Sequence, residues 1–112
     1  MASLDFDKEK SNFREYYDIH RNTLHRAGSQ LESLIAALTS SIRENEEPTV
    51  THRVKDREEC IKKFARKYQT GLESSRTDYE IRDHITDLIG LRVVCYYEID
   101  IPRVVGLLRQ NF

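Results

Sequence analysis

Two charged residues lie in a segment of the chain that is otherwise almost entirely apolar. Residues 88–97 are rich in β-branched and aromatic types, which predicts a buried strand, yet Asp87 precedes this segment and Arg92 lies within it. Charges at a buried strand are costly unless they are paired or hydrated in a cleft. Two explanations are open: an ion pair of Asp87 with Arg92 or Arg82, or a site in which Asp87 holds Mg²⁺ and Arg92 faces a phosphate.

A second group of charges has the spacing of a polyphosphate site. Arg53 and Lys55 occupy alternate positions at a predicted strand, so both point to the same side, and the helix expected next carries basic residues three and four positions apart. Arginine offers forked donors to phosphate oxygens, and lysine offers a compact charge. A solvated helix face is the alternative, but the two cations on the strand favour an anion site. The group comprises Arg53, Lys55, Lys62, Lys63 and Arg66.

The charge distribution supports a local anion site. The net charge is −1, but residues 48–67 hold seven basic and three acidic residues and carry +4. The segments on either side, 1–47 and 68–112, carry −3 and −2. Such a concentration favours a localised anion site over a general nucleic-acid surface.

Composition limits the class of protein. The chain has 112 residues, 38% apolar and 33% charged, which predicts one domain with one modest core. No apolar run approaches the roughly 20 residues that cross a bilayer, and the acidic N-terminal segment lacks a signal-type stretch, so we expect a cytoplasmic protein without a membrane partner. Cys60 and Cys95 lack metal-ligand spacing and are expected to be buried thiols. The isolated glycines give no support to a phosphate-binding glycine loop.

The first half of the chain has clear element signals. Apolar residues three and four apart predict helix over 6–45, and Gly28 leaves open whether this is one helix or two. The β-branched run 49–54 predicts a strand. A helix over 56–68 follows, and Asp56 is placed to cap it.

The second half is predicted from turn residues and apolar runs. Its polar stretch is expected to be a surface loop, and Asp100 is expected to cap the last helix, with Pro102 in the first turn. The expected buried side of that helix includes Val104 and Val105. The predicted elements are a loop at 69–78, a short helix at 84–89 between Asp83 and Gly90, a strand at 91–97 and a helix from 100 onward. Since two strands make a poor independent core, we expect the front part of a larger unit.

The stretches "HRVKDREECIKKFARK" and "ITDLIGLRVVCYYEIDIPRVVGLLRQNF" strongly resemble the front half of the RelA/SpoT-type synthetase domain, the family of guanosine tetra- and pentaphosphate (alarmone) synthetases, especially its small single-domain members. The resemblance rests on R-x-K, a Lys/Arg-rich helix and D-[LI]-x-G-[LI]-R-[VI]. It implies N-terminal helices over 1–47 and the front half of the synthetase domain over 48–112. The implied fold is α+β: a nucleotidyltransferase-like mixed sheet flanked by helices, incomplete in this chain.

The resemblance also implies an activity, that of a GTP pyrophosphokinase of the stringent response. Such an enzyme transfers the β,γ-pyrophosphate of ATP to the 3′-hydroxyl of GDP or GTP with Mg²⁺ as cofactor. By the match of motifs, Asp87 and Arg92 are the implied catalytic residues. Asp87 is the implied Mg²⁺ ligand, and Arg92 is implied to lie near the substrate phosphates. The positions implied to hold ATP are Arg53, Lys55, Lys63 and Arg66.

The sequence departs from the family pattern in two ways. Many members carry serine where this chain has Glu59, and a glutamate there would repel phosphate unless it turns back to cap the helix start. The family's second acidic residue, in an E-x-Q-x-R-like strand, and its guanine-stacking tyrosine loop have no counterpart up to Phe112. We therefore expect an ATP–Mg²⁺ half site without an acceptor site, and no synthesis by this chain alone.

Two other functions compete with this one. Some members of the family resemble toxins that pyrophosphorylate the 3′ end of tRNA, and others make adenosine alarmones; the cations of 53–67 fit tRNA as well as ATP. A different class is a helical interaction module, in which the apolar pattern from Tyr17 to Ile42 forms a homo-oligomer. Coverage of the domain's own sheet by this helix is the favoured alternative to oligomerisation.

Overall fold

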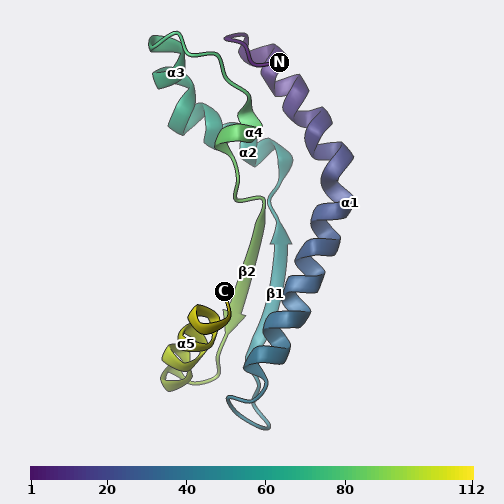
Figure 1. Cartoon of the computed structure of the whole chain (residues 1–112), viewed down its shortest axis with the longest axis vertical. Helices are drawn as coiled ribbons and strands as arrows, with labels where there is room; N and C mark the ends of the chain where they lie inside the picture. Colours follow the sequence, from purple (N-terminus) through teal and green to yellow (C-terminus); the bar gives the residue numbers. More distant parts are fainter. The chain divides into compact units, whose positions relative to one another are not determined.

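The computed structural model describes all residues, 1–112, and shows an α+β chain (Figure 1). Strands β1 and β2 pair as a two-stranded antiparallel sheet, which confirms the predicted α+β class. None of the helices combines the length and the apolar character needed to cross a membrane. In chain order the elements are α1 (Phe6–Thr39), β1 (Thr49–Val54), α2 (Arg57–Phe64), the π-helical turn η1 (Ala65–Gln69), α3 (Thr70–Ser74), α4 (Ile81–His84), β2 (Ile89–Val94), the 3₁₀ turn η2 (Glu98–Asp100) and α5 (Ile101–Asn111).

The chain folds as two compact units. Unit 1 contains Met1–Leu24 and Val54–Leu88, and unit 2 contains His25–Arg53 and Ile89–Phe112. Helix α1 contributes its first part to unit 1 and its second part to unit 2. Each unit thus combines one part of this helix with segments that are distant in sequence.

Helix α1 is continuous across Gly28, so the pattern over this region belongs to one helix and not two. A Cβ atom at Gly28 would lie 2.6 Å from Cδ2 of His52, which shows how closely β1 approaches the helix in unit 2. The predicted end at residue 45 is wrong. The helix ends at Thr39, whose hydroxyl donates to the carbonyl of Ile35 at 2.9 Å and so competes with the backbone for acceptors.

Aromatic rings fill the core of unit 1. Phe64 is fully buried and lies 4.9 Å from the Tyr79 ring, centroid to centroid. Cys60 is buried, as predicted, whereas Cys95 is only half-buried, and both are free thiols. The buried cluster consists of Phe13, Tyr17, Cys60, Ile61, Phe64, Tyr79, Ile81, Ile85 and Leu88.

The start of α2 is formed as predicted. The carboxylate of Asp56 accepts the backbone amides of Glu58 at 3.0 Å and Glu59 at 3.1 Å. This satisfies amides that have no partner within the first turn. The cap therefore fixes the residue at which α2 begins.

The predicted loop at 69–78 is wrong for its first part. Helix α2 passes into η1 and then α3, so the chain stays helical to Ser74. Tyr68 and Leu72 pack against the core of unit 1, and this burial stabilises helix in a polar stretch that contains Gly71. Turn residues follow only after Ser74.

The short helix predicted at 84–89, with its cap at Asp83, is also wrong. Helix α4 spans Ile81–His84 and ends where the amide of Ile85 donates to the Ile81 carbonyl at 3.0 Å. Beyond it the chain is extended, with Ile85 and Leu88 buried and the two residues between them exposed. The two apolar residues are both buried without a further helical turn.

Strand β1 has its predicted bounds, but β2 spans Ile89–Val94 and not 91–97, so Gly90 lies in a strand and does not end a helix. The prediction that this strand is buried is wrong as well. Leu91 is 37% exposed and Val94 47% exposed. With only β1 as a neighbour, one edge of β2 has no partner, and its apolar side chains are incompletely covered.

Helix α5 begins with Pro102 in its first turn, as predicted. The carboxylate of Asp100, 2% exposed, does not cap the helix; it accepts Nε of Arg43 at 2.9 Å. Val104 is buried but Val105 is exposed, so the predicted buried side is only partly buried. The Arg43–Asp100 pair joins the segment after α1 to the start of α5 within unit 2.

Candidate functional site

Three of the predicted site residues meet in unit 1: Lys55, Lys63 and Asp87. Lys55 follows β1, and its backbone is held on both sides, because its amide donates to the Leu88 carbonyl at 2.8 Å and its carbonyl accepts the Tyr17 hydroxyl at 2.7 Å. Lys63 lies in the last turn of α2. Asp87 lies in the extended segment between Ile85 and Leu88, both buried. The fold thus brings together side chains from three separate segments.

The two ammonium groups share one carboxylate oxygen. Nζ of Lys63 donates to Oδ2 of Asp87 at 2.8 Å, and Nζ of Lys55 lies 3.6 Å from the same atom. The hydrogen bond from Lys63 lowers the pKa of Asp87, and the same bond raises the pKa of Lys63. Both groups are therefore charged at neutral pH. We call Lys55, Lys63 and Asp87 the Lys–Asp cluster.

The ion pair considered from the sequence is not formed. Asp87 pairs with neither Arg92 nor Arg82; it pairs with the two lysines. Arg82 instead donates to Glu80 at 3.0 Å. The sequence placed Lys55 and Lys63 in a strip of cations, but their convergence on Asp87 depends on the extended segment, which had been predicted as helix.

Arg53 and Arg92 lie together in unit 2, on neighbouring strands. They line an open hollow of about 380 Å³ with Thr51, His52, Gly90 and Leu91. Both arginines are exposed, and neither takes part in an ion pair. A Cβ at Gly90 would lie 3.9 Å from the Arg53 carbonyl oxygen, which is an ordinary contact distance. Two unpaired guanidinium groups around a hollow can hold a phosphate by forked hydrogen bonds.

Thr51 and His52 were not singled out as site residues from the sequence. The alternation of β1 places Thr49, Thr51 and Arg53 on its exposed face. That period of two was the signal that could have added Thr51 to the site. His52 lies on the inward face, with Nδ1 3.0 Å from Oε1 of Glu32.

The remaining members of the cationic strip differ in their surroundings. Arg66 is exposed on η1 and makes no ion pair, so its guanidinium is available to an anion. Lys62 pairs with Glu59 at 3.4 Å on the surface of α2. Glu59 therefore does not turn back to cap the helix; Asp56 has that role. Lys55 and Lys63 pair with Asp87, and Lys62 pairs with Glu59, so Arg53 and Arg66 are the two cations of the strip without an ion pair.

A network of charged side chains holds the start of α2, and no pattern in the sequence indicated it. The carboxylate of Glu58 accepts Nη2 of Arg14 at 2.7 Å and Nε of Arg57 at 2.9 Å. These hydrogen bonds, that from Arg14 foremost, lower the pKa of Glu58 to about 2. Arg57 also reaches Asp18 at 2.8 Å. This network holds the start of α2 against α1 within unit 1.

The Lys–Asp cluster offers one carboxylate to a metal ion. No group of three or more His, Cys, Asp or Glu side chains gathers anywhere in the chain. Mg²⁺ commonly binds through one or two carboxylates and completes its shell with water and substrate phosphate oxygens. Asp87 fits that arrangement only when a phosphate is bound beside it and the lysines have released it.

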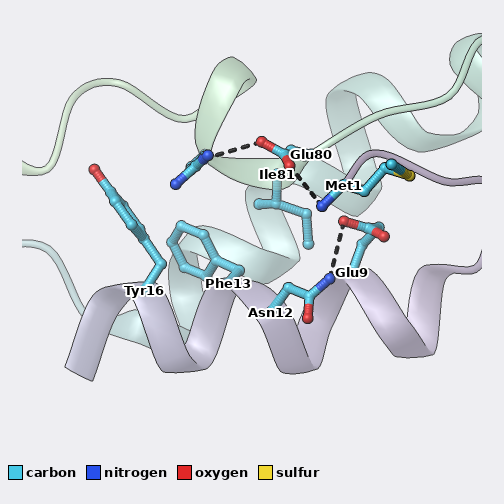
Figure 2. Close-up of a pocket in the computed structure, with 8 residues that line it drawn as sticks. Met1, Glu9, Asn12, Phe13, Tyr16, Glu80 and Ile81 are labelled. Atoms are coloured by element: carbon cyan, nitrogen blue, oxygen red, sulfur yellow. Dashed lines mark hydrogen bonds and ion pairs between the residues drawn. The ribbon is translucent and has the colours of Figure 1, made fainter. Parts of the chain in front are cut away.

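Unit 1 also has a pocket away from the predicted residues (Figure 2). It has a volume of about 190 Å³ and lies between α1 and the residues around α4. Its buried carboxylate, Glu9, accepts the Ser3 hydroxyl at 2.6 Å, and the ammonium of Met1 lies 3.3 Å from Glu80. Its polar groups are largely bonded to each other. None of the predicted site residues lines it.

Comparisons with protein-family models, with curated proteins and with solved structures found no match.

Proposed function

We propose that this chain provides the ATP–Mg²⁺ side of a pyrophosphotransferase site of the RelA/SpoT type, within a nucleotidyltransferase-like sheet. The observation that carries the proposal is the Lys–Asp cluster. Lys55, Lys63 and Asp87 are distant in sequence, have the residue types of a Mg²⁺–phosphate site, and meet at one point in unit 1. These three residues are among the six that the motif resemblance implies for the site.

The chemistry of the cluster suits a nucleoside triphosphate. Lys55 and Lys63 can each donate to phosphate oxygens, and their charges oppose the repulsion among those oxygens. Arg66 extends the set as an exposed cation on η1. In unit 2, Arg53 and Arg92 offer forked donors to a phosphate.

The proposed reaction is the transfer of the β,γ-pyrophosphate of ATP to the 3′-hydroxyl of GDP or GTP. Bound Mg²⁺ supplies charge neutralisation at the phosphates. Lys55, Lys63 and Arg66 of unit 1 bind and orient the triphosphate, and Asp87 provides the protein's carboxylate ligand. No residue described above has a role toward a guanine acceptor, so the proposal concerns the donor side of the reaction.

Buried apolar residues of α1 in both units favour a helix that covers the chain's own elements over a helical interaction module. Tyr17 of this helix is buried in unit 1 and Ile35 is buried in unit 2. Leu31 and Ile35 also line an apolar hollow with Leu91 and Val93 of the sheet. Part of the apolar pattern of α1 is thus buried by contacts within the chain, whereas Leu34 is 48% exposed.

The proposal is tested by calorimetric titration of the chain with a non-hydrolysable ATP analogue in the presence of Mg²⁺. We expect Lys63→Gln to weaken binding roughly tenfold, the scale of one charge-assisted hydrogen bond. Lys67→Gln is the matched control, because Lys67 is exposed on the same helical segment and pairs with no carboxylate. Equal affinities of the two variants would refute a phosphate role for the cluster.

The same assay separates the nucleotide from tRNA. A tRNA with an intact 3′ end is titrated in place of the analogue. If tRNA binds in a Lys63-dependent manner and the analogue does not, the chain belongs with the tRNA-modifying alternative, and the ATP proposal is wrong.

A further inference from the structure

The carboxylate of Asp87 occupies the place where a phosphate oxygen would be expected in the Lys–Asp cluster. Its Oδ2 atom accepts Lys63 at 2.8 Å and lies 3.6 Å from Nζ of Lys55. A phosphate oxygen bound by the same two lysines would need the same position. In the free chain the phosphate-binding groups are therefore engaged by a carboxylate of their own protein.

We propose that Asp87 is an internal counter-ion that a polyphosphate must displace, and that a divalent cation completes the exchange by binding the released carboxylate. This inference rests on the proposed function, because it assumes that the Lys–Asp cluster binds phosphate. It adds that anion and metal bind cooperatively, and that Asp87 opposes anion binding when no metal is present.

The exposure of the side chains permits the exchange. Asp87 is 55% exposed and Lys63 only 19% exposed. The carboxylate can therefore turn toward solvent by side-chain rotation, while the stem of Lys63 stays packed on unit 1. The backbone need not move, because Ile85 and Leu88 are buried on either side of the exposed residues.

The charges of the cluster make anion binding depend on whether a divalent cation is present. Two lysines and one aspartate carry a net charge of +1, so the free cluster attracts an anion only weakly. Once displaced, Asp87 remains close to the phosphate, and like charges a few ångströms apart repel. A divalent cation between carboxylate and phosphate turns that repulsion into attraction, so each ligand raises the affinity of the other by the same factor.

Metal alone is expected to bind weakly for the same reason. It would have to break the hydrogen bond from Lys63 and approach two uncompensated ammonium groups. Lys63→Gln removes one of these competitors, so this variant should bind Mn²⁺, used as a probe, more tightly than the natural chain in the absence of phosphate. Paramagnetic broadening of the Asp87 amide resonance measures this affinity.

An ordinary surface ion pair gives the opposite expectation. If the ion pair of Asp87 with the two lysines only holds the extended segment in place, Asp87→Asn either leaves anion binding unchanged or weakens it. Any such effect is then the same with and without metal. The internal counter-ion predicts effects of opposite sign under the two conditions. This reversal of sign distinguishes the two roles.

The test is calorimetric titration with inorganic tripolyphosphate, once with a chelator and once with excess Mg²⁺. The natural chain is compared with Asp87→Asn and with the control Asp83→Asn, an exposed aspartate of unit 1 that makes no ion pair. Without metal, we expect Asp87→Asn to bind about fivefold more tightly, the scale of one unit charge at about 4 Å in water. With Mg²⁺, we expect it to bind several-fold more weakly than the natural chain.

Each outcome decides a separate point. If no chain binds tripolyphosphate in either condition, the proposed phosphate site is wrong, and the counter-ion role is wrong with it. If the natural chain binds but Asp87→Asn shifts affinity equally in both conditions, the counter-ion role is refuted and the phosphate site stands. Should Asp87→Asn fail to fold by circular dichroism, Asp87→Ser and the manganese measurement on Lys63→Gln decide the same question.

Discussion

A single methyl group added at Gly28 should test how closely His52 of β1 packs against α1. Alanine in place of glycine inside an exposed helix ordinarily stabilises a protein by about 0.5–1 kcal/mol. Here the new Cβ would lie 2.6 Å from Cδ2 of His52, and the ring is further held by Glu32 at 3.0 Å. Overpacking of this kind costs about 1–3 kcal/mol. We therefore expect Gly28→Ala to lower the free energy of unfolding by up to about 2.5 kcal/mol, which is the overpacking cost less the gain in helix propensity.

The assay is urea unfolding followed by circular dichroism, arranged as a double-mutant cycle. In a His52→Ala background the obstruction is gone, so Gly28→Ala should now stabilise by about 0.5–1 kcal/mol. If the effect of Gly28→Ala on the free energy of unfolding reverses sign between the two backgrounds, the close packing of His52 on α1 is supported. If Gly28→Ala stabilises equally in both backgrounds, His52 does not lie over the helix, and the placement of Arg53 beside it is also wrong.

Two further predictions concern unit 1. Phe64→Ala should lower the free energy of unfolding by about 3–5 kcal/mol, because it empties the centre of the aromatic core, whereas Phe112→Ala, at an exposed ring, should change it by less than about 0.5 kcal/mol; urea unfolding measures both, and similar losses would contradict the assigned core. The depressed pKa of Glu58, about 2 against 4.5 for a free group, means that its pairing stabilises the fold above pH 4.5 and that this contribution is lost as the pH falls toward 2. Glu58→Gln should therefore flatten the dependence of the urea midpoint on pH in that window, and an unchanged slope would show that the pairs with Arg14 and Arg57 do not form.

Local signals were sufficient where a single segment decides its own structure. The run of β-branched residues after Pro48 predicted β1 with its correct bounds, and Asp56 predicted the start of α2. Pro102 was placed correctly in the first turn of α5. In each case the side chains or the backbone of the same few residues determine the outcome.

Sequence patterns led to wrong predictions where contacts between distant residues determine the local structure. Leu72 packs on the core of unit 1 and keeps a polar, glycine-containing stretch helical, which its composition does not show. The backbone bond between Lys55 and Leu88 accompanies an extended segment where a helix had been predicted. The apolar pattern of β2 predicted a buried strand, but burial depends on what covers the faces of the sheet, and Leu91 and Val94 remain 37% and 47% exposed.

The candidate site shows the same division. The types and spacing of Arg53, Lys55 and Lys63 led to the prediction of an anion site, which stays a prediction, and Asp87 was recognised as an unusual charge. The partner of Asp87 could not be predicted, because it depends on how the segment before β2 runs past the end of α2. The sequence offered two arginines as partners, and the fold supplies two lysines.

The most direct test of the donor-site assignment is an amide NMR titration of the isotope-labelled chain with a non-hydrolysable ATP analogue and Mg²⁺. We expect resonance shifts at Lys55, Lys63 and Asp87, with further shifts at Arg53 and Arg92, and none at the pocket around Glu9. A well-dispersed spectrum without shifts at the Lys–Asp cluster, or with shifts confined to that pocket, would contradict the assignment of these residues to ATP.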